Sequence, residues 1–176
     1  DVYKRQHISL LKEYGFNRIS LGIQDFKEDV LKAINRKSSK FKLEDIIAKI
    51  KNEGFTGTNI DLVYGLPLQT VESFNQTVDR AIKLDTDRIV TFSYAHVPSV
   101  ITRQKVLDKI GFPSANEKAE MYQNAYDKFI EAGYVAIGMD HFAKPHDELA
   151  IALKNKTLHR NFCLLYTSDA ADDRGC

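Results

Sequence analysis

The sequence lacks three features that would each point to a particular class of protein. No apolar run approaches the roughly 18–20 residues of a membrane span, no long run of like charge occurs, and 25 basic residues nearly balance 24 acidic ones. These absences argue against a membrane-spanning protein, a polybasic membrane anchor and a dedicated nucleic-acid binder. Residues 1–12 have no signal-peptide layout, so we expect a cytoplasmic chain.

Cysteine is also scarce. The chain of 176 residues contains two cysteines, Cys163 and Cys176, both near its end. Two thiols placed in this way form no disulfide framework. With 43% hydrophobic residues, the chain can form one packed domain, or a piece of a larger one.

The two ends of the chain differ in character from the rest. Residues 163–176 show neither a helical nor a strand period. Residues 1–6 and 163–168 can be encoded by opposite strands of one short DNA, as expected if an inverted adapter flanks an inserted sequence. We therefore predict that residues 1–6 and 163–176 are foreign and that residues 7–162 are a fragment of one domain.

The region between the ends alternates β-rich runs with amphipathic stretches. The β-rich runs cover residues 17–24, 58–64, 88–94 and 135–139. Apolar residues at helical spacing occupy residues 27–35, 43–52, 71–84 and 117–132. Strands separated by single helices favour βαβ units. The sequence predicts an α/β fold, part of a β/α barrel with about four parallel strands, and a loop with a short helix over residues 98–113.

Polar or aromatic side chains follow every predicted strand. The runs end in Gln24, Tyr64, His96 and the pair Asp140–His141. Because the carboxyl ends of parallel strands meet at one edge of a sheet, these ends predict a common site. Asp61 lies inside its run, where a carboxylate costs free energy unless it is paired or binds something.

Structural roles are the alternatives for these residues. Gln24 could cap the next helix, Asp61 could be a satisfied structural carboxylate, and Arg36 could be a cation that suits a helix end. No metal site is predicted, because the spacing of the candidate ligands matches no known motif. Those candidates are His96, Asp140, His141 and His146. The sequence has no G-x-x-x-x-G-K-[ST] phosphate loop either.

Several motifs together resemble a known family. Residues 15–26, 35–36, 59–67 and 69–70 resemble the radical S-adenosylmethionine (SAM) enzymes of the coproporphyrinogen group. The later motifs resemble the branch that oxidises coproporphyrinogen rather than the relatives that carry haem. These are residues 94–98, 138–143, 147–150 and 158–162. The resemblance covers essentially all of residues 7–162.

The resemblance implies a partial β/α barrel that binds SAM and a [4Fe–4S] cluster. Reductive cleavage of SAM would give a 5′-deoxyadenosyl radical, which removes hydrogen from the β-carbon of a substrate propionate. Loss of an electron and CO₂ then leaves a vinyl group. Two propionates of coproporphyrinogen III would react, giving protoporphyrinogen IX in anaerobic haem biosynthesis. The implied electron donor is a reduced flavoprotein or ferredoxin, and the parent protein would be a monomer.

The resemblance also implies roles for five residues. Gln24 and Asp61 would hold the ribose hydroxyls of SAM, and Arg36 would pair with its methionine carboxylate. Val63 and Ala95 would line the adenine. The resemblance gives no individual roles to Asp140 and His141, and no catalytic residue is predicted.

One motif of the family is missing. The family holds its cluster with a Cys-x-x-x-Cys-x-x-Cys set, and this sequence has no such set. We therefore expect an oxidoreductase as the parent and an inactive chain on its own. The open alternatives are a haem-carrier relative, a β/α-barrel metal enzyme using His96, Asp140 and His141, and a fragment without a function of its own.

Overall fold

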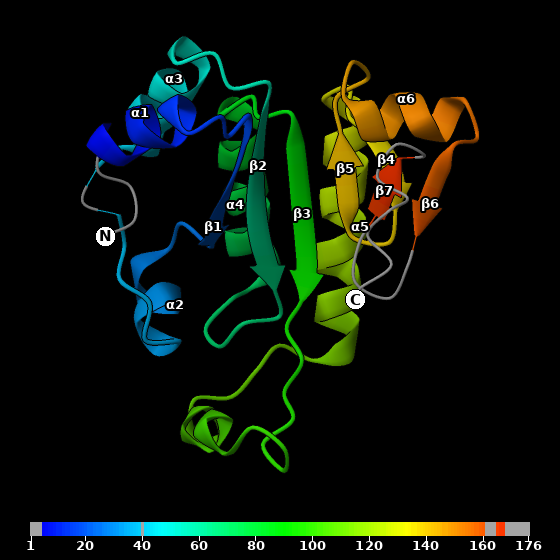
Figure 1. Ribbon diagram of the computed structural model, residues 1–176. Coiled ribbons are helices and arrows are strands. Elements are labelled where there is room, and N and C mark those ends of the chain that lie inside the picture. Colours follow the sequence, from blue (N-terminus) through cyan, green and yellow to red (C-terminus); the bar gives the residue numbers. More distant parts are fainter. Residues whose placement is uncertain (1–4, 40, 161–164, 168–176) are drawn as a thin grey trace.

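A five-stranded sheet forms the centre of the molecule. The computed structural model describes residues 5–39, 41–160 and 165–167. The strand order is β1-β2-β3-β5-β4, as Figure 1 shows. The strands are β1 (Arg18–Gln24), β2 (Gly57–Tyr64), β3 (Arg88–Ser93), β4 (Val135–Gly138) and β5 (His141–Ala143).

The first three strands are parallel, as the sequence predicts. Leu21 of β1 pairs with Ile60 of β2, and Ile60 pairs with Ile89 of β3. Each of these side chains is buried, and their neighbours along each strand point to the opposite face. Apolar residues on the covered face thus set the register of the parallel sheet.

The prediction for the fourth strand is partly wrong. The sequence places His141 at the end of this strand, but His141–Ala143 is a separate strand, β5, antiparallel to both β3 and β4. The chain reverses because Gly138 and Met139 adopt φ angles of 132° and 51°. β4 therefore runs in the direction of β3 but is separated from it by β5.

Helices connect the strands where the apolar spacing predicts them. Two of them begin with capping boxes, formed by Thr70 with Ser73 and by Ser114 with Glu117. The predicted loop carries a 3₁₀ helix, η1 (Thr102–Lys109), beyond the carboxyl ends of the strands (Figure 1). The α-helices are α1 (Arg5–Glu13), α2 (Glu28–Ala33), α3 (Leu43–Asn52), α4 (Val71–Lys83), α5 (Ala115–Glu131) and α6 (Glu148–Lys154).

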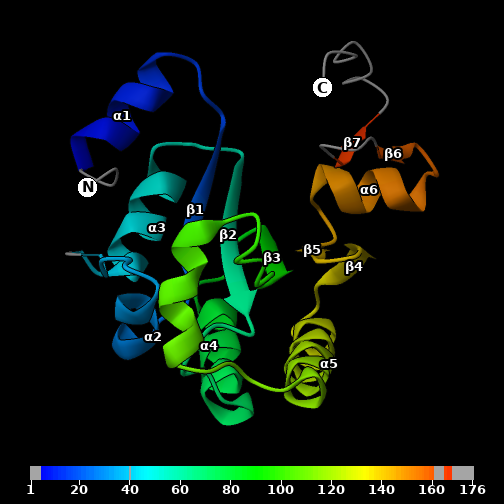
Figure 2. The ribbon, with the colours of Figure 1, turned by 90° about the horizontal axis from the view of Figure 1, so that it is seen from below.

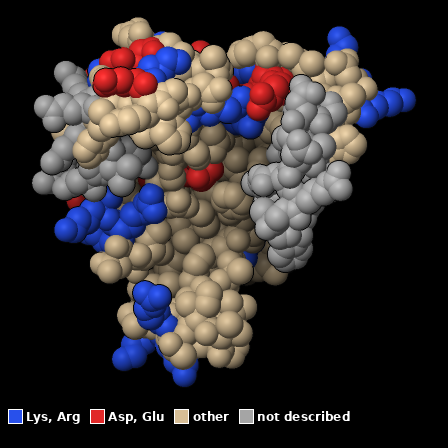
Figure 3. Space-filling view, viewed as in Figure 1, with Lys and Arg blue, Asp and Glu red and all other residues tan. Residues whose placement is uncertain are grey.

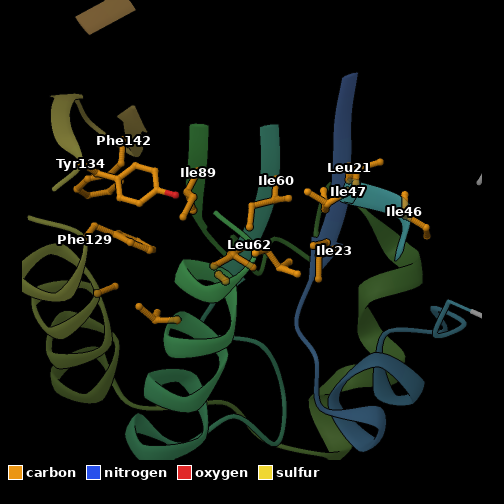
Figure 4. Packing of buried hydrophobic residues seen from close by; sticks show 14 of the residues in the cluster. Leu21, Ile23, Ile46, Ile47, Ile60, Leu62, Ile89, Phe129, Tyr134 and Phe142 are labelled. Atoms are coloured by element: carbon orange, nitrogen blue, oxygen red, sulfur yellow. The ribbon is translucent and has the colours of Figure 1, made fainter. Parts of the chain in front are cut away.

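One face of the sheet packs on helices and forms the core. Helices α4 and α5 lie on the same side of β2 and β3 in the view of Figure 2. Strand residues such as Leu21, Ile60 and Leu62 belong to one buried cluster with Ile47 of α3 and Phe129 of α5 (Figure 4). Burial of each such side chain contributes about 1.5–3 kcal/mol, so this face holds the strands in place.

The other face of β1 and β2 is polar, whereas β3 adds the apolar residues Val90 and Phe92 to it. Ser20 and Gly22 of β1, with Asn59 and Asp61 of β2, alternate with the buried apolar residues. Figure 3 shows this side as a hollow that is mostly tan, with one acidic patch inside it. β1 and β2 thus present polar side chains to this hollow.

The sheet is open, as expected for part of a barrel. β6 (Leu158–Arg160) and β7 (Leu165–Thr167) form a separate antiparallel pair. The sequence predicts neither strand, and β7 lies within the segment that it predicts to be foreign. No helix in the described part of the chain is long and apolar enough to span a membrane.

Candidate functional site

The end of β1 places Gln24 on the polar side of the sheet. Gln24 is the last residue of the strand and has a φ of 70°, a conformation that non-glycine residues seldom adopt. The residue that precedes α2 as its N-cap is Lys27. The alternative that Gln24 caps this helix is therefore wrong.

Arg36 reaches back to the same strand. Its guanidinium donates a hydrogen bond to the carbonyl oxygen of Gly22. A Cβ on Gly22 would lie 2.9 Å from Nε2 of Gln24 and 3.1 Å from Nη2 of Arg36. The two side chains thus lie together over the glycine, which has space for them only because it has no side chain.

Asp61 lies beside this pair, on the neighbouring strand. It is the register partner of Gly22, so its side chain leaves the same face of the sheet. Its carboxylate accepts hydrogen bonds from Nδ2 of Asn59 at 2.7 Å and from Oγ of Ser20 at 3.2 Å. Gln24, Arg36 and Asp61 therefore surround one position, Gly22.

Val63 and Ala95 lie further towards the carboxyl ends. Val63 is two residues beyond Asp61 on the same face of β2 and is half-buried. Ala95 follows β3 and is exposed. Its carbonyl oxygen accepts a hydrogen bond of 2.9 Å from Gln104 of η1. The five predicted residues thus lie on or beyond the carboxyl-terminal halves of β1–β3, with Ala95 at the outer edge.

Two groups of the candidate site are charged but have neutral partners in the described structure. Arg36 donates to a backbone carbonyl, and Asp61 accepts from an amide and a hydroxyl. The guanidinium has five N–H donors, and the bond to Gly22 uses one of them. A ligand with a carboxylate for Arg36 and hydroxyl groups for Asp61 and Gln24 would fit these side chains.

The residues considered for a metal centre do not lie together. His96 pairs with Asp108 of η1 at 2.5 Å, whereas His146 pairs with Asp87 at 3.0 Å, before the start of β3. Among the described residues, no three His, Cys, Asp or Glu side chains are grouped to hold a metal ion. The alternative of a β/α-barrel metal enzyme has no support in this part of the chain.

Phenol groups lie near the carboxyl end of the sheet. Burial raises the pKa of Tyr122, and the charge of Asp140 raises it further. Burial, followed by the charge of Asp108, raises the pKa of Tyr94 in the same direction. Both phenols stay protonated at neutral pH, and Tyr122 donates to the carbonyl oxygen of Met139 at 2.9 Å.

A depression of about 310 Å³ lies on the same face but towards the amino ends of the strands. Arg18 and Arg88, which line it, are paired with Asp147. Their charges are neutralised within the protein. Ser20 and Asn59, which also line the depression, donate to Asp61, so the depression adjoins the site around Gly22.

Two further residues, outside the predicted set, shape the site. Gly22 makes room for Gln24 and Arg36, and Gln104 holds the backbone on both sides of His96 by bonding to Ala95 and Val97. A glycine inside a strand pattern is a signal for close approach of other groups. The role of Gln104 depends on the loop conformation, which has no such signal.

Comparisons with known proteins show the family to which the chain is related. The sequence pattern of the Radical SAM superfamily matches residues 1–81. The oxygen-independent coproporphyrinogen III oxidase of Salmonella typhimurium is 44% identical over 152 residues, which are 86% of this chain and 33% of that protein. The enzyme of the same name from Pseudomonas aeruginosa is 45% identical over 155 residues, 88% of this chain and 34% of that protein. The chain thus spans about a third of the length of these relatives.

Solved structures show the same relationship. The structure of the radical SAM enzyme coproporphyrinogen III oxidase from Escherichia coli has a TM-score of 0.88 at 40% identity, covering 93% of this chain and 38% of that one. The archaeal Elp3 of Methanocaldococcus infernus has a TM-score of 0.57 at 18% identity, which shows a shared fold alone. The chain is therefore a radical SAM protein, homologous over most of its length to the oxygen-independent coproporphyrinogen III oxidases.

Proposed function

We propose that this chain is a segment of an oxidoreductase that converts coproporphyrinogen III to protoporphyrinogen IX. The reaction turns two propionate groups into vinyl groups with release of CO₂. The identity of 44% to an enzyme of this name and the TM-score of 0.88 to another support the proposal. The structural observation that carries it is the meeting of Gln24 and Arg36 over Gly22, beside Asp61.

These residues fit SAM as the ligand. Arg36 would bind the methionine carboxylate with its remaining N–H groups, and Gln24 and Asp61 would bind the ribose hydroxyls. Val63 and Ala95 would contact the adenine through apolar and backbone groups. Bound SAM supplies the radical chemistry of the reaction, and the residues of this chain hold and orient it.

The residues of this chain do not fit the [4Fe–4S] cluster. A cluster of this type needs thiolate ligands, and residues 5–160 contain no cysteine. We therefore assign no step of the reaction to this chain alone and propose that the cluster ligands belong to another part of a longer protein, called the full-length oxidase below. Its electron donor, monomeric state and cytoplasmic location are also proposals, which rest on the resemblance to the family.

The boundaries of the segment are part of the proposal. Residues 7–162 would belong to the barrel, and residues 1–6 and 163–176 would be foreign. Sequencing of the source DNA tests this point directly. A reading frame that joins a three-cysteine motif to His7 without interruption is the expected result, whereas a native frame that encodes residues 1–6 would contradict the boundary.

The activity is tested on the full-length oxidase with its cluster reconstituted under anaerobic conditions. We expect SAM cleavage and formation of protoporphyrinogen IX from coproporphyrinogen III. Haem titration of the same preparation distinguishes the haem-carrier alternative. Tight haem binding without turnover of coproporphyrinogen III would overturn the proposed function in favour of that relative.

A further inference from the structure

A buried carboxylate lies directly behind the candidate site. Asp25, the residue after Gln24, is 1% exposed. Its Oδ1 accepts hydrogen bonds from the backbone N–H of Lys27 at 2.8 Å and from Oγ1 of Thr77 at 2.9 Å. Its Oδ2 accepts from Nε2 of Gln69 at 2.5 Å. Asp25 thus connects the end of β1 to helix α4 and to the loop after β2.

Gln69 uses all of its amide groups in this connection. Besides its bond to Asp25, Nε2 donates to the carbonyl oxygen of Val63 at 2.9 Å, while Oε1 accepts from the N–H of Leu66 at 2.8 Å. Gln69 is 5% exposed and Thr77 is 3% exposed. A chain of buried hydrogen bonds therefore joins the residue next to Gln24 to the backbone of Val63.

The partners of Asp25 in the described structure are all neutral. A buried charge without a cation costs free energy, which its hydrogen bonds offset only in part. An apolar residue in this place would leave the donors of Lys27, Gln69 and Thr77 without this acceptor. The benefit of the carboxylate is geometric, because it accepts three donors from three different segments and fixes their separation.

The conformation of Gln24 requires such a constraint. Its φ of 70° is unfavourable for a residue with a side chain, as is the φ of 65° at Leu68, next to Gln69. Unfavourable backbone conformations persist when the surrounding structure fixes them. The hydrogen bonds of Asp25 and Gln69 hold the backbone immediately after Gln24 and Leu68.

We propose that Asp25, Gln69 and Thr77 are positioning residues for SAM. They set the distance between the ends of β1 and β2, so that Gln24 reaches the ribose while Val63 lies along the adenine. None of the three is assigned to contact the ligand. The inference rests on the proposed function, since it concerns how the same site binds SAM.

The test compares isosteric variants of the full-length oxidase. In Asp25→Asn the new NH₂ group faces donors from Gln69 or Thr77, so the ends of the strands move apart. We expect the Kd for SAM, measured by equilibrium dialysis, to rise about tenfold, as for the loss of one buried hydrogen bond to a charged group. The KM for coproporphyrinogen III should change less than twofold, because the three residues are buried and offer this substrate no surface to contact.

Thr77 provides a second route to the same answer if Asp25→Asn does not fold. Thr77→Val keeps the shape of the side chain and removes one donor to Asp25, and we expect the Kd for SAM to rise about threefold. Thr77→Ser keeps the hydroxyl and should bind SAM like the wild type. Equal affinity for SAM in the wild type, Thr77→Val and Thr77→Ser would overturn the inference.

Asp87→Asn is the matched control. Asp87 also accepts from a buried threonine, Thr58, with bonds of 2.7 Å from its N–H and 2.8 Å from its hydroxyl, but at the amino ends of the strands. We expect this variant to lower the Tm without changing the Kd for SAM. If both aspartate variants weaken SAM binding in proportion to their loss of Tm, Asp25 is structural and the inference is wrong. If the wild-type oxidase itself binds and cleaves no SAM, the proposed function fails and the inference fails with it.

Discussion

Charged residues at the two ends of the parallel sheet have different kinds of partner. At the amino ends, Arg18 and Arg88 pair with Asp147 at 3.1 and 2.9 Å, and both also contact Glu148. At the carboxyl ends, Arg36 and Asp61 have neutral partners. Paired charges stabilise the fold, whereas charges held by neutral groups can still pair with a ligand. This difference supports the proposal that the ligand binds at the carboxyl ends.

The largest effect should come from removing a charge at the carboxyl ends. Arg36→Met keeps the apolar stem of the side chain and removes the guanidinium. We expect SAM to bind the full-length oxidase about 10- to 100-fold more weakly, because a hydrogen-bonded charge pair is lost. Equilibrium dialysis measures the change.

Arg18→Met is the control at the other end of the sheet. It breaks the pairs with Asp147 and Glu148, so it should lower the Tm and leave the affinity for SAM unchanged. Equal losses of SAM affinity in the two variants would show that the charged residues at both ends of the sheet affect SAM binding alike.

Two glycines allow a finer comparison. A Cβ on Gly22 would lie 2.9 Å from Nε2 of Gln24, and one on Gly57 would lie 2.7 Å from Cζ of Arg18. Gly22→Ala should displace the ligand-binding side chains and weaken SAM binding about tenfold, with a loss of stability near 1 kcal/mol. Gly57→Ala should displace Arg18 from its carboxylates and reduce stability alone.

Calorimetric unfolding and SAM binding, measured on both variants, check this prediction. The control is internal, because each alanine adds the same methyl group to a strand beneath a cationic side chain. A loss of SAM affinity in Gly57→Ala, with none in Gly22→Ala, would contradict the assignment of the site to the carboxyl ends.

The sequence predicts the part of the fold that depends on local periodicity. Strands β1–β3 and helices α3–α5 follow from apolar spacing, which one buried face imposes on each element. The resemblance to the family supplies the five site residues, and their placement near the carboxyl ends follows from parallel topology. The sequence therefore predicts where the site lies, at the carboxyl ends of the parallel strands.

The sequence does not predict features that depend on contacts between distant segments. β5 is three residues long, and its reversal depends on the φ angles of Gly138 and Met139. The function of Gly22 becomes visible only when Arg36 folds back over it. Asp25 and Gln69 are 44 positions apart in the chain, and no local pattern shows that their side chains meet.

A smaller effect concerns acid stability at the amino ends. Burial raises the pKa of Asp87, but the hydrogen bonds from His146 and Thr58 outweigh burial and lower it below the ordinary value of 3.8. Because the pKa is lower in the folded protein than in the unfolded chain, the bonds stabilise the fold above about pH 4. This stabilisation disappears as the pH falls through the folded-state pKa.

Asp87→Asn should therefore lose stability mainly at neutral pH, by about 1–2 kcal/mol. Its Tm should approach that of the wild type as the pH is lowered from 6 to 3. Thermal unfolding of both proteins across this range measures the difference. A gap in Tm that stays constant down to pH 3 would show that ionisation of Asp87 does not stabilise the fold.

The smallest expected effect concerns the two carboxylates that pair with Arg18 and Arg88 at the amino ends of the strands. Asp147 is buried, pairs with Arg18 and Arg88, and caps α6 through the N–H of Leu149 at 2.8 Å. The side chain of Glu148 is 56% exposed. Glu148→Gln should cost less than about 1 kcal/mol, and added salt should remove the difference, because 1 M salt shortens the Debye length to about 3 Å.

Asp147→Asn should cost more than Glu148→Gln and keep most of its effect in 1 M salt, since burial protects its ion pairs from screening. The Tm of each variant, measured in low and high salt, separates the two. If both variants respond to salt alike, the amino ends carry only surface ion pairs. The sheet would then be held by its apolar core, and the contrast between its ends would concern ligand binding alone.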